Sequence, residues 1–426
     1  MKVDVILGLQ WGDEGKGKIV DVITPNYDIV ARFQGGPNAG HTLKFDNKKF
    51  VLHTIPSGIF RANTLNVIGN GVIIDPVIIL NKEINPISEY VDVRSKLLFS
   101  EKSHLILPSH RLLDFANEKM LGNSKIGSTL KGIGPTYTDK TARNGIRMGD
   151  ISLSNFKQKY NNLTARHFQL ISSMGISIND ITIEGYSFEV YEQKWFEAIE
   201  VLKQYQLINC EYFINNALKE GKRILAEGAQ GSLLDLDYGS YPFVTSSSTI
   251  AAGVCSGLGI PPSSVGEVFG IFKAYCTRVG SGPFPTELNN EIGEKLREIG
   301  GEFGSTTGRA RRCGWLDLPM LKYSCMLNGV TQLIMMKADV LDNFASVDVC
   351  TDYIKDGKVN NQIPYAIDES VVLNYTSFEG WEKAKNSETL PSQLQSYVKF
   401  IADYVETPIT IVSMGPDRTQ TIFLNK

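Results

Sequence analysis

The sequence predicts an α/β fold in which helices flank a large, mostly parallel central β-sheet, with a variant of the phosphate-binding loop after its first strand. Three observations predict it. The chain opens on a short aliphatic run, which is followed by a glycine-rich turn and an apolar helical segment. Further short apolar runs recur along the chain. Long segments separate these runs, and such connections are typical of crossovers between parallel strands.

The predicted elements follow in chain order. Val3 to Leu9 is β-branched and aliphatic, which indicates a buried strand. After the turn from Gly12 to Lys18, apolar residues between Ile19 and Ile23 supply one face of a helix that Pro25 limits. Five more runs are predicted as strands: Ile29 to Phe33, Leu65 to Gly69, Arg223 to Ala226, Glu267 to Tyr275 and Thr331 to Met336.

No internal repeat and no linker rich in proline, glycine and serine divides the chain. We therefore expect one large α/β domain over residues 1–426. We expect it to carry a helical insertion at about 100–210 and a substrate loop at about 300–314, because long glycine-rich loops in compact enzymes are often binding loops.

Composition excludes several classes of protein. The chain has 426 residues and is 42% hydrophobic, which is enough for a large core. Its net charge of -3 provides no bulk attraction to nucleic acid or to an anionic membrane. No apolar run reaches the ~18 residues that cross a bilayer, and the N-terminus lacks a signal-peptide pattern. The six cysteines are scattered without a CxxC pair, which indicates reduced thiols in a cytoplasmic protein.

The first candidate site is GDEGKGK, from Gly12 to Lys18, between the first strand and the first helix. Glycines let backbone N–H groups approach an anion, and Lys16 and Lys18 can neutralise phosphate oxygens. The motif departs from a standard phosphate loop, because Asp13 replaces a glycine and no serine or threonine follows the lysine. The alternative is a solvated turn with chance charges.

The second candidate is GGPNAGHT, from Gly35 to Thr42, a constrained turn that presents His41 and the Gly40 carbonyl. Carbonyl and carboxylate oxygens suit Mg²⁺, and a histidine can polarise a phosphoryl oxygen. The alternative for a single histidine is a hydrogen-bonded packing residue. We assign that packing role to the other four histidines, His53, His104, His110 and His167.

A third candidate is STTGRARRCGWLD, from Ser305 to Asp317, whose threonines and arginines favour a dicarboxylate or another phosphate. The tetrapeptide from Met336 to Asp339 follows an apolar strand, where an aspartate can read guanine. Ser413 to Ile422 is a turn that can close over a base. Two polar segments in the middle of the chain, Ile126 to Arg147 and Glu227 to Thr249, carry groups that suit a ribose or phosphate.

Together the motifs resemble one family. QWGDEGKGK, GGPNAGHT, KGIGPTYTDK, EGAQG, YPFVTSS, TTGRARR, KADVLD and SMGPDRT occur in the order found in adenylosuccinate synthetases, from Gln10 to Ile422. The resemblance implies a GTP-dependent ligase that joins L-aspartate to IMP through a 6-phosphoryl-IMP intermediate. It also implies Mg²⁺ as cofactor, a homodimer in the cytoplasm, and no nucleic-acid or membrane partner.

The resemblance also implies roles for matched residues. Asp13 resembles the base that takes the N1 proton of IMP, His41 resembles the residue that stabilises the transferring phosphoryl group, and Lys16 resembles the lysine that neutralises its charge. Asp13 and the Gly40 carbonyl would hold Mg²⁺. Arg143 resembles an arginine that reaches the IMP site of the neighbouring subunit.

Substrate contacts follow by matched position. GTP is expected at Gly12, Asp13, Glu14, Gly15, Lys16, Gly17, Lys18, Gly40, His41, Thr42, Arg311, Lys337, Ala338, Asp339, Ser413, Met414 and Gly415. IMP is expected at Asp13, Glu14, Gly15, Lys16, Asn38, Ala39, Gly40, His41, Thr129, Arg143, Gln230, Thr245 and Arg309. L-aspartate is expected at Ser305, Thr306, Thr307, Gly308, Arg309, Ala310 and Arg311.

Three residues depart from the family pattern. Leu130 and Lys131 stand where many members have glycine and arginine, from which we expect the same charge on a stiffer loop. Ala310 stands where members often have proline or arginine. The rival readings are a regulatory GTPase, another amide-forming ligase similar to dethiobiotin synthetase, and an inactive homologue. The missing loop serine or threonine and the Met336 position disfavour the first, and intact Asp13 and His41 disfavour the last.

Overall fold

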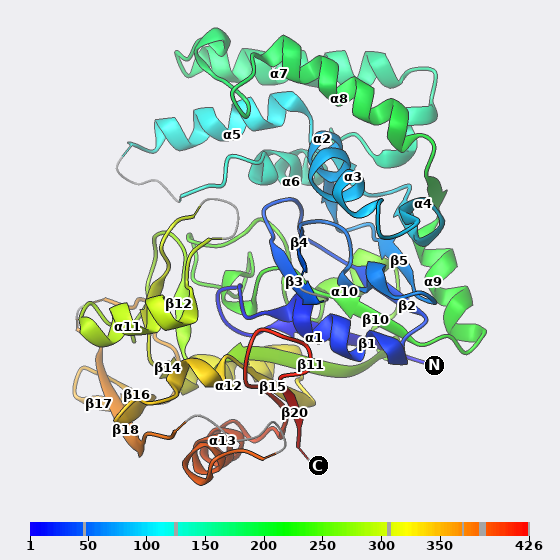
Figure 1. The fold of residues 1–426 in the computed structure, drawn as a ribbon. Helices are drawn as coiled ribbons and strands as arrows, with labels where there is room; N and C mark the ends of the chain where they lie inside the picture. The colour runs from blue at the N-terminus through cyan, green and yellow to red at the C-terminus, as the bar shows by residue number, and fades with distance from the viewer. Residues whose placement is uncertain (46–47, 123–126, 305–307, 369, 383–388, 425–426) are drawn as a thin grey trace.

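The computed structural model describes residues 1–45, 48–122, 127–304, 308–368, 370–382 and 389–424. Its centre is a ten-stranded sheet in the order β20-β19-β15-β11-β1-β10-β2-β5-β7-β9, parallel throughout except for β20. This arrangement confirms the predicted α/β class (Figure 1). The strands are β1 (Val3–Gly8), β2 (Ile29–Arg32), β5 (Leu65–Ile68), β7 (Leu97–Ser100), β9 (Gln206–Ile208), β10 (Ile224–Glu227), β11 (Val265–Lys273), β15 (Gln332–Met336), β19 (Ile409–Ser413) and β20 (Thr421–Phe423).

All six strands predicted from the sequence lie in this sheet, where they occupy six consecutive positions from β15 to β5. The prediction missed β7, β9, β19 and β20, which form the two ends of the sheet. The first helix, α1 (Lys16–Ile23), also forms as predicted, and Pro25 lies in the short 3-10 helix that follows it. Ile19, Val20 and Ile23 of α1 pack on the sheet in one apolar cluster with Ile6 and Val30.

A helical layer lies above the sheet in the view of Figure 1. It contains α5 (Pro108–Met120), α6 (Ile133–Thr141), α7 (Phe156–Ser173) and α8 (Phe188–Leu202), which all fall within the range predicted for a helical insertion. Apolar side chains of this layer form one core with residues of β5 and β7, and Trp195 is fully buried in it among aromatic neighbours. Shorter helical segments lead into it: α2 (Pro76–Ile78), a π-helix (Ile79–Ile84), α3 (Asn85–Ile87) and α4 (Val93–Lys96).

The remaining helices and small sheets lie around the central sheet (Figure 1). The helices are α9 (Cys210–Lys219), α10 (Gly253–Leu258), α11 (Glu291–Gly300), α12 (Leu318–Asn328) and α13 (Ser392–Val405). The small sheets contain β3 (His41–Phe45) with β4 (Lys48–Leu52), β6 (Ile73–Ile74) with β8 (His104–Leu105), β12 (Cys276–Arg278) with β13 (Arg312–Gly314), and β14 (Leu316–Asp317) with β16 (Ser346–Lys355), β17 (Lys358–Asn360) and β18 (Val372–Glu379).

Two composition-based expectations bear on this fold. The six cysteines form no disulfide, as expected for reduced thiols. Within the described residues, no helix has both the length and the apolar character to cross a membrane.

Candidate active site

The glycine-rich loop joins the carboxyl end of β1 to the start of α1, at the centre of the sheet. Gly12, Asp13 and Gly15 all have positive φ, at 84°, 59° and 93°. This left-handed backbone curls the chain so that amide groups converge, a geometry that favours anion binding. Asp13 adopts it without the freedom of a glycine, which places its carboxylate at the mouth of the loop.

Glu14 fills the inside of this loop. Its side chain is fully buried, and one carboxylate oxygen accepts hydrogen bonds from the backbone N–H groups of Gly12 (2.9 Å) and Gln10 (3.2 Å). The other oxygen pairs with Lys16 Nζ at 2.6 Å. A Cβ at Gly8 or Gly231 would overlap this carboxylate, so glycine at both positions makes room for it. The Gly12 N–H group and the Lys16 ammonium group of the loop are therefore both directed at the Glu14 carboxylate.

The two loop lysines have different partners. Lys16 Nζ donates to the carbonyl of Gln230 at 2.5 Å in addition to its pair with Glu14. Lys18 Nζ donates instead to Ser413 Oγ at 2.7 Å, at the end of β19, and to the Gly415 carbonyl at 2.8 Å, in the turn between β19 and β20. Burial lowers the pKa of Lys18 to about 8 although the charge of Asp339 opposes the shift. Lys18 thus ties α1 to the C-terminal turn.

His41 lies at the start of β3, buried against the loop, where an added Cβ on Gly17 would come within 3.1 Å of its own Cβ. Its Nδ1 faces Glu227 Oε1 at 3.3 Å, and its Nε2 is hydrogen-bonded to Arg32. Burial, followed by the charges of Arg32 and Lys16, lowers the pKa of His41 well below its usual range. The ring is therefore neutral, with Nε2 accepting from the guanidinium.

Arg32 and Glu227 belong to the site although the sequence did not predict them there. They are paired in register as the last residues of the neighbouring parallel strands β2 and β10. Glu227 also accepts from Ser57 N at 2.8 Å and Ser57 Oγ at 2.7 Å. A charged residue that ends an otherwise apolar strand was the available signal, because the carboxyl ends of parallel strands form the usual ligand crevice.

Two predicted IMP residues present buried polar groups without a hydrogen-bond partner in the described structure. These atoms are Nε2 and Oε1 of Gln230 and Oδ1 of Asn38. Gln230 also has a positive φ of 56°, next to the glycine loop. Buried polar groups are normally satisfied, so these atoms mark a place built for a polar ligand.

Asp13 and Arg311 connect the glycine loop to the loop between Glu302 and Arg312 (the arginine loop). Arg311 Nε lies 2.9 Å from Asp13 Oδ2, and NH1 lies 2.6 Å from Glu302. The arginine loop closes through an antiparallel bridge between Phe303 and Ala310. Gly308, Arg309 and Ala310 are exposed on it. The predicted residues Ser305, Thr306 and Thr307 lie outside the described residues.

The remaining predicted residues take these places. An added Cβ on Gly127 would come within 3.6 Å of the Arg309 guanidinium, so the segment that carries exposed Thr129 borders the arginine loop. Arg143 is exposed just after α6, with a φ of 65°.

Thr245 is half-buried and donates its N–H to the Leu234 carbonyl. Thr42 and Gly40 are half-buried and Ala39 is buried. Lys337 Nζ donates to the Gly300 carbonyl at 2.6 Å, and the short helix that starts at Ala338 holds Asp339. Met414 is half-buried between Ser413 and Gly415.

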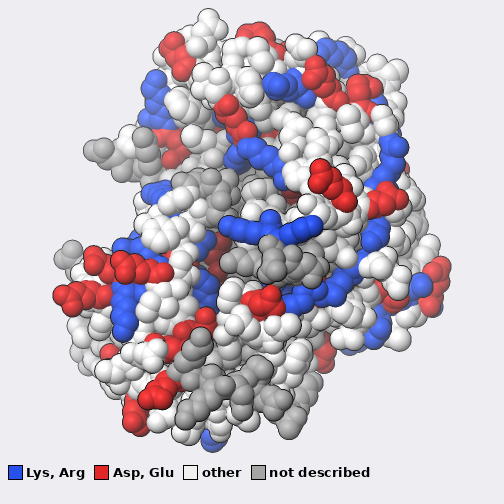
Figure 2. Space-filling model, viewed as in Figure 1, with Lys and Arg blue, Asp and Glu red and all other residues white. Residues whose placement is uncertain are grey.

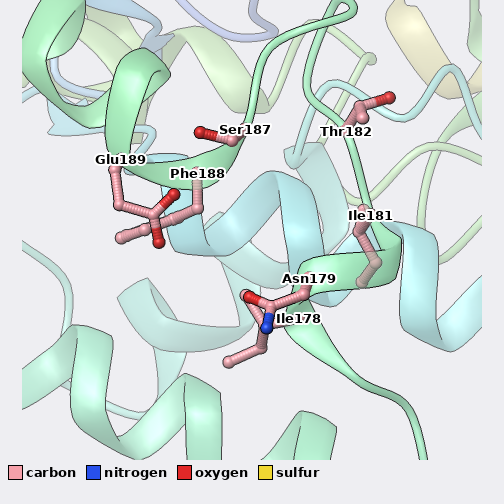
Figure 3. Close-up of a pocket in the computed structure, with 7 residues that line it drawn as sticks. All are labelled: Ile178, Asn179, Ile181, Thr182, Ser187, Phe188 and Glu189. Atoms are coloured by element: carbon pink, nitrogen blue, oxygen red, sulfur yellow. The ribbon is translucent and has the colours of Figure 1, made fainter.

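Lysine and arginine side chains gather across the middle of the viewed face, between the helical layer and the sheet (Figure 2). A separate cavity of about 170 Å³ lies in the helical layer, between the 3-10 helix at 178–180 and the start of α8 (Figure 3). It shares no residue with the predicted site; its lining residues are Ile178, Asn179, Ile181, Thr182, Ser187, Phe188 and Glu189.

The donor set at Asp13 and Gly40 fits Mg²⁺, because both residues offer hard oxygens and Mg²⁺ takes few protein ligands besides phosphate and water. The described residues bring three other potential ligands together once, at His110, Asp139 and His167. His110 Nδ1 accepts from the Leu107 N–H at 2.9 Å, and burial lowers the pKa of His110 to about 4. Its proton is therefore on Nε2, which donates to Asp139 at 2.9 Å, so this group is a hydrogen-bond network that does not fit a metal.

The parallel sheet carries a glycine loop, two buried lysines (Lys16 and Lys18) and unsatisfied polar groups beyond the ends of its strands. These features define an α/β enzyme that binds phosphorylated ligands. The sequence profile of the family described as adenylosuccinate synthetase matches residues 5–422. The chain belongs to this family, whose members are ligases that form a carbon–nitrogen bond.

Individual relatives match over their whole length. An adenylosuccinate synthetase of Flavobacterium johnsoniae is 57% identical over 428 residues, with 99% of this chain and 100% of the relative covered. One from Christiangramia forsetii is 56% identical over 427 residues, with the same coverage. The solved structure of fully ligated adenylosuccinate synthetase from Plasmodium falciparum superposes with a TM-score of 0.90 at 37% identity, and each chain is fully covered.

Proposed function

We propose that this protein joins L-aspartate to IMP with GTP, giving adenylosuccinate, GDP and phosphate. The observation that carries the proposal is the ion pair between Asp13 and Arg311, which links the phosphate loop to the loop expected to bind L-aspartate. In this reaction the purine ring of IMP, the γ-phosphate of GTP and the amine of L-aspartate have to meet at one point. Asp13 lies at that point, on the mouth of the glycine loop.

The first chemical step is phosphorylation of IMP. Asp13 takes the N1 proton, the 6-oxygen forms a bond to the γ-phosphorus of GTP, and the bond from that phosphorus to GDP breaks. Phosphoryl transfer depends mainly on positioning and on neutralised charge, which Lys16 and the loop amides supply. When the phosphates enter, they compete with Glu14 for Lys16 and for the Gly12 N–H.

His41 is neutral in this structure, and its Nε2 accepts from Arg32. An incoming phosphoryl group is an anion, which favours the protonated imidazole and competes for the arginine. Nε2–H then donates to a phosphoryl oxygen, while Glu227 supports the Nδ1 side of the ring. Asp13 and the Gly40 carbonyl would hold Mg²⁺, which would further neutralise the phosphate charge.

The second step displaces the new phosphate. The neutral amine of L-aspartate forms a bond to C6, the bond from C6 to oxygen breaks, and phosphate leaves with the proton that the nitrogen releases. Arginines 309 and 311 hold the two carboxylates of the amino acid through paired hydrogen bonds. Arg143, exposed beyond α6, reaches the IMP site of a second subunit in a homodimer.

The test is formation of the succinyl-purine, followed by ultraviolet absorbance in a mixture of IMP, GTP, Mg²⁺ and L-aspartate. Asp13→Asn should lower kcat by ~10³-fold or more, since a positioned base contributes ~10²–10⁴. Asp356→Asn is the matched control, because Asp356 also has a positive φ (53°) but lies in the turn between β16 and β17. No product from the wild type, or the same product without L-aspartate, contradicts the proposal.

The shared site has its own test. We expect Arg143→Leu and Asp13→Ala to be inactive separately and to regain activity when their subunits exchange. A mixture that stays inactive after demonstrated exchange excludes a site completed by the neighbouring subunit.

A further inference from the structure

Glu302 is a buried carboxylate that the proposed reaction does not use. It follows α11, and its side chain is fully buried. The carboxylate accepts from Arg311 NH1 at 2.6 Å, Lys337 Nζ at 2.7 Å and Lys273 Nζ at 3.0 Å. The Tyr275 hydroxyl donates to it at 2.5 Å. One carboxylate thus collects three cations and a phenol from three separate parts of the chain.

The charges explain how this group is kept ionised. Burial alone would raise the pKa of Glu302, but the charges of Lys273, Lys337 and Arg311 hold it well below its usual range. A buried carboxylate is tolerated when cations and hydrogen bonds satisfy it, as here. Three positive charges around one negative charge leave the cluster net cationic, and Asp13 on the outer side of Arg311 offsets only one more of them.

The backbone places Glu302 at the base of the arginine loop. Its N–H donates to the Arg297 carbonyl at 2.8 Å, and its carbonyl accepts from the Arg311 N–H at 2.9 Å. Side-chain and backbone contacts between Glu302 and Arg311 therefore act in parallel across the two ends of the loop. The bridge between Phe303 and Ala310 joins the two sides of the loop next to this pair.

The two sides of the carboxylate differ. Lys273 and Tyr275 lie behind it, and both are fully buried. Arg311 extends from it to Asp13 in the glycine loop. The Lys337 side chain reaches from its left-handed backbone to Glu302 and the Gly300 carbonyl, and Lys337 is two residues before Asp339 in the chain. Glu302 thus anchors one cation from the L-aspartate end and one from the guanine end of the proposed site.

We infer that Glu302 is a positioning residue that orients Arg311 and Lys337 together, and so couples binding of GTP to binding of L-aspartate. This inference rests on the proposed function. Glu302 touches neither substrate itself. It acts by restricting two long cationic side chains to one conformation each, which lowers the entropy that substrate binding has to remove.

The test measures Michaelis constants for the three substrates in Glu302→Gln, which keeps the shape and removes the charge. We expect the values for GTP and L-aspartate each to rise about tenfold, with that for IMP within about twofold of the wild type, because hydrogen bonds to charged groups are the strong ones. The matched control is Lys273→Met, which removes a cation from the same carboxylate on the side away from the site. It should lower thermal stability and leave all three constants near wild-type values.

Three results overturn the inference: unchanged constants in Glu302→Gln, equal rises for all three substrates, or the same pattern in Lys273→Met. If Glu302→Gln does not fold, Glu302→Asp carries the same test, because it keeps the charge and withdraws it from Arg311 and Lys337. Wild-type protein that forms no adenylosuccinate contradicts the proposed function instead, so the two failures are distinguishable.

Discussion

At the carboxyl ends of the central strands β2 and β10, His41 lies between Arg32 and Glu227. In the helical layer, His110 and His167 both lie against Asp139. Each cluster is buried and combines imidazole with a carboxylate. Burial lowers the pKa of His41 and of His110 alike. Neither burial nor a shifted pKa therefore separates a reactive cluster from a structural one.

Their surroundings separate them. The cluster in the sheet lies at the carboxyl ends of parallel strands, beside a glycine loop and the unsatisfied groups of Gln230 and Asn38. In the helical layer all four ring nitrogens have partners: the Leu107 N–H, Ser109 Oγ and, twice, Asp139. A satisfied network stabilises the helical layer, whereas a network bordered by unpaired polar atoms is suited to a ligand.

The same substitution in both clusters should give opposite results. His41→Leu is expected to lower kcat by ~10²–10³-fold, the range for one lost donor to a developing negative charge. Its stability should fall by only about 1 kcal/mol, because Glu227 keeps Ser57 and Arg32 as partners. Turnover assays and urea unfolding measure the two effects. Near-normal kcat would remove His41 from the reaction.

His167→Leu is the matched change in the helical layer. It removes the bonds to Ser109 Oγ and Asp139, both 2.8 Å, and should lower the free energy of unfolding by about 2 kcal/mol. We expect kcat to stay within about twofold, since α7 contributes no residue to the proposed site. A large loss of kcat with unchanged stability would show that the helical cluster takes part in catalysis.

The sequence predicted the glycine loop and His41 but not the charged side chains that surround them, for physical reasons. The β1 strand, its glycine loop and α1 are contiguous, so period and composition identify them together. Arg32 and Glu227 meet only through strand register, and Glu302 gathers partners from positions 273, 311 and 337. Such contacts have no local signal. The outer strands β9 and β20 have three residues each, too few to establish an alternating pattern.

Acid should destabilise the fold through His110 as well as through His41, because burial lowers the pKa of both. The pKa of His110 falls from an ordinary 6.5 to about 4 on folding, so the unfolded chain binds the proton first. Stability is fully present above pH 6.5 and is lost as the pH falls toward 4. Between pH 6.5 and 5 the loss from this residue is up to ~2 kcal/mol, at 1.36 kcal/mol per pH unit.

Urea unfolding at pH 7 and pH 5 measures that loss, and His110→Gln is its control. Glutamine does not titrate in this range, so the variant should lose less stability between the two pH values than the wild type. Parallel losses in both proteins would place the acid sensitivity elsewhere.

The smallest effect is expected where the two regions meet. Leu130 follows the segment beside Arg309, has a φ of 55°, and accepts a hydrogen bond from Arg111 of α5 at its carbonyl. A left-handed leucine costs about 1–2 kcal/mol, and glycine removes that cost at the expense of about 0.5–1 kcal/mol of extra chain entropy on folding. Leu130→Gly should therefore raise the free energy of unfolding by about 0.5 kcal/mol. It should also loosen the loop that carries Thr129, and so raise the Michaelis constant for IMP.

Leu130→Val is the matched control, because a β-branched residue is strained more in this conformation and should destabilise the protein. A glycine variant less stable than the wild type would show that packing of the half-exposed Leu130 side chain outweighs its backbone strain, and that the helical layer extends up to the edge of the site.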